Sequence, residues 1–225
     1  MREFLVNIRL TPYCLCLLVC FALCGCLVPD KYIATLSLSN NAYSVDFIGK
    51  MHMAASYSDT YKQGSDNPRQ LASSIIREFE RVIQERQQGK AEQGKLETML
   101  LDEHSFGAKF LYVSPYYLTE ATGMFAFTIS GDTLTVISRP ISTKDMEFLK
   151  QHNLTSKGSL CIKAFGTVLE SNADKHATLI DMCHRWELND LERSVKLVVR
   201  FSKPVPMTPQ AYQDALNAPQ GRRPQ

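Results

Sequence analysis

The sequence has little excess charge of either sign and lacks the short motifs of the common enzyme classes. Its 225 residues carry 25 basic and 23 acidic side chains, a formal net charge of +2. A chain so close to neutral has no large basic face to offset phosphates, which argues against a nucleic-acid-binding protein. The chain contains no Gly-x-Ser-x-Gly elbow, no Gly-x-x-x-x-Gly-Lys loop and no His-Glu-x-x-His pair. No internal repeat or long low-complexity tract is present.

Groups that bind metals or transfer protons are also sparse. The five histidines occur singly, at His52, His104, His152, His176 and His184. Only Asp102-Glu103-His104 combines acid and imidazole locally, and a polar turn is the simpler interpretation, with acid-base catalysis as the alternative. Cys161 and Cys183-His184 lack a second closely spaced ligand pair, so we do not expect zinc. The sequence therefore predicts no metal, no cofactor and no recognisable enzyme activity.

What the sequence does have is a leader. Two arginines precede an apolar run from Leu10 to Leu23, which ends in Cys24-Gly25-Cys26. This order is typical of a bacterial lipoprotein signal peptide over residues 1–25, cleaved between Gly25 and Cys26. Cys26 would be the lipid anchor, carrying acyl chains such as palmitate, because each buried CH₂ contributes about 0.8 kcal/mol. The alternative is that Leu10 to Val28, close to the ~20 residues that cross a bilayer, remains as an uncleaved anchor.

Both alternatives place the rest of the chain outside the cytoplasm. We expect a location at the cell membrane, or at an outer membrane because Leu27 rather than aspartate follows the anchor, facing the periplasm or the exterior. Membrane lipid is the expected partner of the anchor, with envelope lipid or envelope proteins as further candidates and no nucleic acid. In an oxidising compartment Cys161 and Cys183 could form a disulfide, and two buried free thiols are the alternative.

After the leader, the pattern predicts one α+β domain over residues 26–202 and a flexible Pro-rich tail over 203–225. Alternating runs predict a hairpin at 31–39 and 43–53, and helical spacing predicts a long helix from Pro68 to about Gln88. A second hairpin turns at Gly131, and a short helix is expected from residue 142 or 143 to 152. The other expected strands are at 96–102, 108–112, 160–170, 177–188 and 194–201.

This order of elements predicts a curved antiparallel β-sheet packed by one long amphipathic helix, plus a short second helix. A helix that closes incompletely on such a sheet leaves an apolar groove that can hold a ligand. Aromatic side chains at strand spacing would line that groove, or would simply belong to the core. The four candidates are Phe47, Tyr112, Phe125 and Phe127.

Four short segments in the second half carry a family resemblance. They are Gly158-Ser159-Leu160, the run from Gly166 to Ala173, Trp186-Glu187-Leu188, and the closing run from Val195 to Phe201. They resemble the C-terminal half of LppM-type bacterial envelope lipoproteins, in which a strand ends in a short Asn-containing turn and the next carries Trp-x-Leu. The chain differs in an insertion around residues 175–182 and in lacking an obvious membrane-spanning segment after the domain. The resemblance implies an envelope protein that handles lipid, with no catalytic residues to carry over.

These observations favour a lipid-anchored, non-enzymatic binding or assembly factor of the bacterial envelope. An envelope enzyme without a recognisable motif is the alternative from another class. A structural lipoprotein that contacts neighbouring envelope proteins through a sheet edge or the tail is a third hypothesis.

Overall fold

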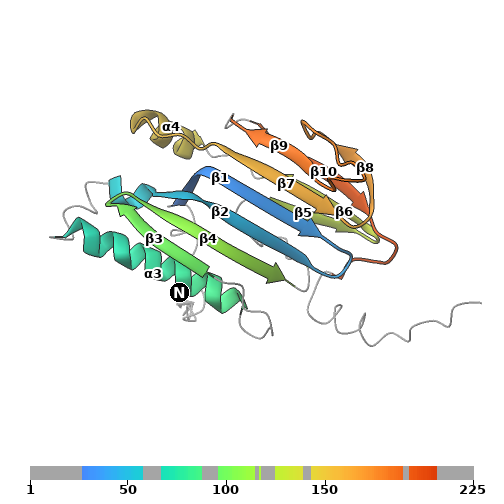
Figure 1. The fold of residues 1–225 in the computed structure, drawn as a ribbon, viewed down its shortest axis with the longest axis horizontal. Coiled ribbons are helices and arrows are strands. Elements are labelled where there is room, and N and C mark those ends of the chain that lie inside the picture. Colours follow the sequence, from blue (N-terminus) through green and yellow to red (C-terminus); the bar gives the residue numbers. More distant parts are fainter. Residues whose placement is uncertain are drawn as a thin grey trace, which may run out of the picture.

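The structure is a computed structural model that describes residues 27–57, 67–87, 96–114, 117, 125–138, 143–189 and 193–206. The leader, with Gly25 and Cys26, and the end of the chain from residue 207 lie outside the described residues. The described part is a mixed α+β fold, mostly β-sheet, with two open sheets and two α-helices (Figure 1).

The elements follow the sequence in a simple order. They are β1 (Leu27–Leu38), β2 (Tyr43–Met53), the 3₁₀ helix η1 (Ala54–Tyr57), α3 (Pro68–Gln87), β3 (Leu96–Asp102), β4 (Ser105–Ser114), β5 (Phe125–Ser130), β6 (Thr133–Ser138), α4 (Thr143–Gln151), β7 (Gly158–Ala164), β8 (Thr167–Ser171), β9 (His184–Leu188) and β10 (Lys196–Arg200).

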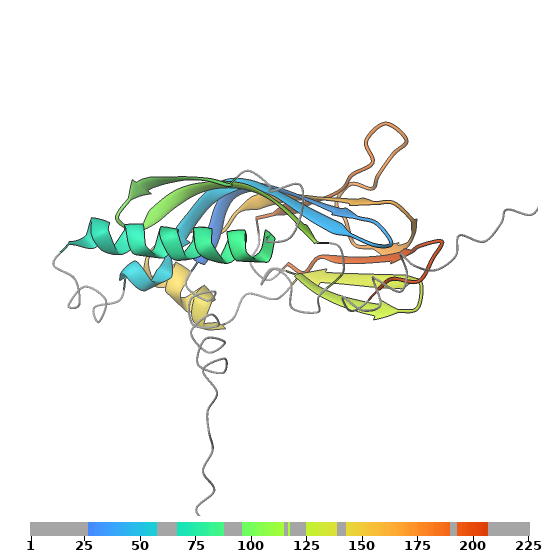
Figure 2. The same cartoon turned by 90° about the horizontal axis from the view of Figure 1, so that it is seen from below.

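The strands form two sheets rather than the single sheet expected from the sequence. Sheet A has the order β3-β4-β2-β1-β7-β9, and sheet B has the order β5-β6-β10-β8. In Figure 2, sheet B and α3 lie on the same side of sheet A. A wholly antiparallel arrangement was also the wrong expectation, because β1 and β7 pair in parallel. Such a parallel pair joins strands far apart in sequence, and no local turn signal predicts it.

The first strand begins four residues earlier than the alternating pattern indicated. It starts at Leu27 and passes through Pro29, which lacks a backbone N–H. Proline is tolerated here because β1 pairs only with β2 at this point, and its pairing with β7 starts at Tyr32. A shift of register between Asp30 and Ile33 then adds one residue to β1, and Lys31 has a φ of 49°.

The run expected as one strand at 160–170 is divided between the two sheets. β7 belongs to sheet A and β8 to sheet B, with Phe165-Gly166 between them. A Cβ atom on Gly166 would lie 2.6 Å from the carbonyl oxygen of Arg200. Glycine therefore lets the chain pass close to β10 as it crosses from one sheet to the other.

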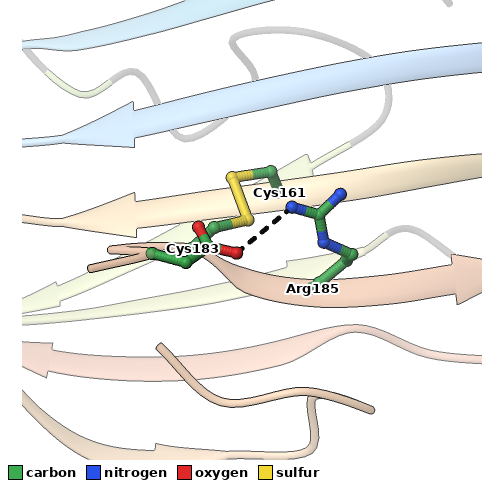
Figure 3. Close-up of a disulfide and its surroundings, with 4 residues drawn as sticks. Cys161, Cys183 and Arg185 are labelled. Carbon is green, nitrogen blue, oxygen red and sulfur yellow. Dashed lines mark hydrogen bonds and ion pairs between the residues drawn. A yellow bond between two sulfur atoms is a disulfide. The ribbon is translucent and has the colours of Figure 1, made fainter. Parts of the chain in front are cut away.

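The strand expected at 177–188 is mostly a loop. Only residues 184–188 form β9, and a turn closes between Thr178 and Asp181, where the Thr178 N–H donates to the Asp181 carbonyl at 2.7 Å. The apolar residues inside this turn give the segment the sequence pattern of a strand. A disulfide joins Cys183, at the end of the loop, to Cys161 on β7, with 5.4 Å between the Cα atoms (Figure 3).

The core is continuous between the layers. Large side chains with 0% exposure come from both sheets, among them Leu36 and Trp186 of sheet A and Leu134 of sheet B. From α3, the ring of Phe79 lies 5.5 Å from that of Phe106 on β4. After β10, the expected tail begins with a packed segment, because Val205 is buried and its N–H donates to the Gly131 carbonyl at 3.0 Å.

The crossover glycine provides a test of this fold. Gly166→Ala should lower the free energy of unfolding by about 1–3 kcal/mol, because the new methyl group meets backbone that cannot move freely. Gly107→Ala is the matched control, since the nearest atom to its Cβ would be 3.9 Å away. We expect urea denaturation to separate the two variants. Equal stabilities would contradict the crossover geometry.

The disulfide provides a second test. The bond joins two cysteines that are 22 residues apart in the sequence and so restricts the unfolded chain. The Cys161→Ala, Cys183→Ala double variant should therefore lose about 3 kcal/mol of stability. Urea denaturation of the double variant and the parent measures the difference. Reductant should destabilise the parent by a similar amount and leave the double variant unchanged. A parent insensitive to reductant would contradict the bond.

Candidate functional site

Polar and aromatic side chains gather at one end of sheet A, which we call the histidine end. It comprises Asp30, His52, Ser56, Tyr57, Glu103, His104, Phe148, His152 and residues 155–157. β1 begins there and β2 ends there, with His52 paired to Val28 on one side and to Ser105 on the other. η1 follows β2 directly, and the segment after α4 reaches the same place. Strand pairing therefore assembles residues that are widely separated in the sequence.

Asp30 is a buried carboxylate in a cradle of donors. Its side chain accepts hydrogen bonds from the Thr155 hydroxyl at 2.9 Å and the Lys157 backbone N–H at 3.1 Å. Beside it, the Ser156 hydroxyl donates to the Pro29 carbonyl at 2.7 Å. These bonds compensate for the removal of the carboxylate from water and tie the start of β7 to β1.

His52 is the buried partner of Asp30. Its Nε2 lies 3.6 Å from the Asp30 Oδ2, which is longer than a direct hydrogen bond, and neither ring nitrogen has a hydrogen-bond partner among the described residues. Burial and the charge of Lys50 lower the pKa of His52, and the Asp30 carboxylate opposes them in part. The imidazole is therefore neutral at pH 7.

His104 lies in the polar turn between β3 and β4. Its backbone N–H donates to the Asp102 carboxylate at 2.8 Å, and its Nε2 lies 3.3 Å from Glu103. Its Nδ1 lies 2.8 Å from the hydroxyl of Ser56, which donates its own proton to the Met53 carbonyl at 2.6 Å. Serine, histidine and carboxylate thus occur together, but the serine is buried and its proton is already held by the backbone. This geometry favours a structural turn over a nucleophile.

Aromatic rings surround this imidazole. The Tyr57 ring stacks on His104 at 4.3 Å between centroids, and lies 4.6 Å from His152 and 5.4 Å from Phe148 on α4. Burial and the nearby charge of Asp102 raise the pKa of Tyr57, so this phenol is neutral at physiological pH. The cluster joins α4 and η1 to the end of sheet A through ring contacts.

The histidines are therefore not scattered in space as they are in the sequence. Three of them meet at the histidine end, and the rings of the other two, His176 and His184, lie 5.7 Å apart beside the disulfide. Burial, with a smaller effect of His176, lowers the pKa of His184. In the described parts of the chain, no three His, Cys, Asp or Glu side chains are grouped so that they could hold a metal ion.

The aromatic residues proposed for a groove have a different environment. Phe47, Tyr112, Phe125 and Phe127 are all buried, with at most 6% exposure, and belong to the continuous core. Phe47 stacks on Phe110 with 5.1 Å between centroids. The structure therefore places all four rings in the core, which was the alternative to the lining of a ligand-binding groove.

The sequence-predicted and structural sites coincide only in part. Of the predicted residues, Cys161 and Cys183 are joined, whereas Gly25 and Cys26 lie outside the described residues. Sequence analysis missed the pairing of Asp30 with His52. The one available signal was a charged residue beside proline at the start of an apolar strand.

No protein-family model and no curated protein sequence matches this chain. None of the helices among the described residues is long and apolar enough to span a bilayer.

The lowered pKa of His52 makes a prediction about stability. Because the folded-state pKa lies below the ordinary value of about 6.5, the unfolded chain binds more protons as the pH falls through that value. The contribution of His52 to the free energy of unfolding should therefore be unchanged above about pH 7 and should decrease as the pH falls below about 6.5. A His52→Gln variant should show a shallower decrease in urea titrations between pH 7.5 and 5. Parallel curves for variant and parent would contradict the assignment.

Proposed function

We propose that the chain is a lipid-anchored bacterial envelope protein that binds or assembles other envelope components, envelope lipid among them, and has no catalytic role. The observation that carries this proposal is the position of the expected cleavage site between Gly25 and Cys26. Cys26 immediately precedes Leu27, the first residue of β1. An acylated Cys26 would thus be joined to the sheet without a linker.

The chemistry of the histidine end supports a binding function over an enzymatic one. Its serine hydroxyl donates to backbone, and the Oδ1 atom of its carboxylate Asp30 accepts from the Thr155 hydroxyl and the Lys157 backbone N–H. Both groups hold elements together. A hydrolase of the serine type needs a hydroxyl whose proton an adjacent base can remove.

The residues that carry the LppM-type resemblance also contact one another. The Trp186 indole N–H donates to the Asn172 side-chain oxygen at 2.8 Å, and the Lys196 backbone N–H donates to the same oxygen at 2.8 Å. A motif whose members interact is a structural unit. The resemblance stays a proposal for the second half of the chain, where the insertion at 175–182 forms the loop between Asn172 and β9.

We further propose that α3 is the long amphipathic helix that covers a curved sheet. Its buried residues Ala72, Ile75 and Ile76 belong to the core, and Phe79 contacts two rings of β4. Such a cover leaves the other side of sheet A free of any described helix (Figure 2).

The anchor is tested by the mass of the N-terminal peptide of the protein isolated from membranes. We expect a peptide that begins at Cys26 and carries acyl groups, and we expect Cys26→Ser to abolish both cleavage and acylation. The same sample should carry co-purifying lipid if the domain binds envelope lipid. A peptide with an intact Met1 would contradict the lipoprotein proposal and favour the uncleaved anchor.

A further inference from the structure

The outer face of sheet A, which points away from α3 and sheet B, carries four exposed apolar side chains among the charged residues Asp46, Lys50, Glu97 and Lys109. Met99 on β3, Leu111 on β4, Ile48 on β2 and Ile33 on β1 are 64%, 39%, 51% and 61% exposed. A sheet with one solvated face normally places polar residues there. Here four neighbouring strands each place an apolar residue on that face instead.

The register shows that these residues share one face. Ile33 pairs with Ile48, and Ile48 pairs with Lys109, which lies two residues from Leu111. Paired residues on neighbouring strands point to the same side, as do residues two apart on one strand. Met99 joins the set because it pairs with Gly107, two residues before Lys109. We call this set the apolar row.

The loop that leads into β9, two strands from β1 in sheet A, exposes further apolar surface. Leu179 and Ile180 are 103% and 98% exposed at the tip of the turn, and Met182 is 49% exposed. In Figure 2 this loop rises from the outer face of sheet A, on the side opposite α3. Two completely exposed aliphatic side chains at the tip of a projecting loop have no role in the stability of the fold.

The loop is firmly held at its base. The Cys161–Cys183 disulfide fixes one end, and Lys175 exchanges backbone hydrogen bonds with Arg185 at 3.2 and 2.8 Å. Arg185 also pairs with Asp181 at 3.4 Å (Figure 3 shows Arg185 beside the disulfide). A tip that is ordered before it binds loses little conformational entropy on binding.

Charges on this surface nearly cancel. On the sheet, Lys50 and Lys109 are balanced by Asp46 and Glu97, with Lys109 directly across from Glu97, and in the loop Asp181 pairs with Arg185. Such a surface is suited to contacts made by apolar burial. It does not require an anionic partner.

We propose that the outer face of sheet A lies against a lipid bilayer, with Leu179 and Ile180 inserted among the acyl chains. This inference rests on the proposed function, because Cys26 is joined directly to β1, and β1 carries Ile33 of the apolar row. The anchor holds the domain at the bilayer and makes a second, weaker contact effective. Moving one leucine or isoleucine from water into hydrocarbon favours insertion by about tenfold or more.

The single tryptophan makes this geometry measurable. Trp186 is 0% exposed, so its fluorescence is a constant background shielded from lipid. The full chain, purified from membranes, is reconstituted into phosphatidylcholine vesicles with brominated acyl chains, which quench nearby indoles. We expect Ile180→Trp and Ile48→Trp to be quenched at least twofold more than the control Ile137→Trp, which is 39% exposed on β6 of sheet B. Anionic lipid should change this difference little.

The outcomes separate the two proposals. Equal quenching at positions 180 and 137 in a protein with an acylated Cys26 overturns the bilayer contact and leaves the anchor intact. Absence of acylation at Cys26 overturns the proposed function itself. A blue-shifted but unquenched Ile180→Trp emission that grows with protein concentration would mean that a second copy covers the tip, which also overturns the bilayer contact.

Discussion

One side-chain amide connects the two sheets, and the architecture of the second half depends on it. The Asn172 Oδ1 accepts from the buried Trp186 indole of sheet A and from the Lys196 backbone N–H at the start of β10 in sheet B, while its Nδ2 donates to the Ser194 carbonyl at 2.8 Å. A buried indole N–H without a partner costs about 1–3 kcal/mol. The same amide thus satisfies the tryptophan and sets how β8, β9 and β10 lie relative to one another.

This connection also determines what the intervening segment can do. Residues 176–182 project from a base that is held by the backbone pairing of Lys175 with Arg185 and by the Cys161–Cys183 disulfide. With both ends held, the tip gains no stability from packing and is free to vary in composition. Folding therefore does not require apolar residues at the fully exposed positions 179 and 180, and the proposed bilayer contact would account for them.

The sequence predicted elements whose period is regular and whose partners are local. The hairpin of β1 and β2, the helix α3 and the turn at Gly131, where φ is 63°, all follow from residue spacing and turn chemistry. The division of 160–170 at Gly166 was missed because the apolar run is continuous across it. The histidine end could not be predicted because its members come from four segments, which the pairing of β2 with β1 and β4 and of β1 with β7 brings together.

The extra residue in β1 explains how this strand can place both Asp30 and Ile33 on the outer face of sheet A. Before the register shift, Asp30 pairs with Lys50 and points outward beside His52, and after it Ile33 pairs with Ile48 and points outward as well. Without the inserted residue the period of two would turn either the carboxylate or the isoleucine toward the core. The irregularity thus lets one strand present a buried polar cradle at its start and an apolar surface farther along. The cradle in turn binds residues 155–157, which tie the start of β7 to the start of β1. Because Leu27 lies three residues before Asp30 on β1, an anchor at Cys26 would enter the domain next to these hydrogen bonds.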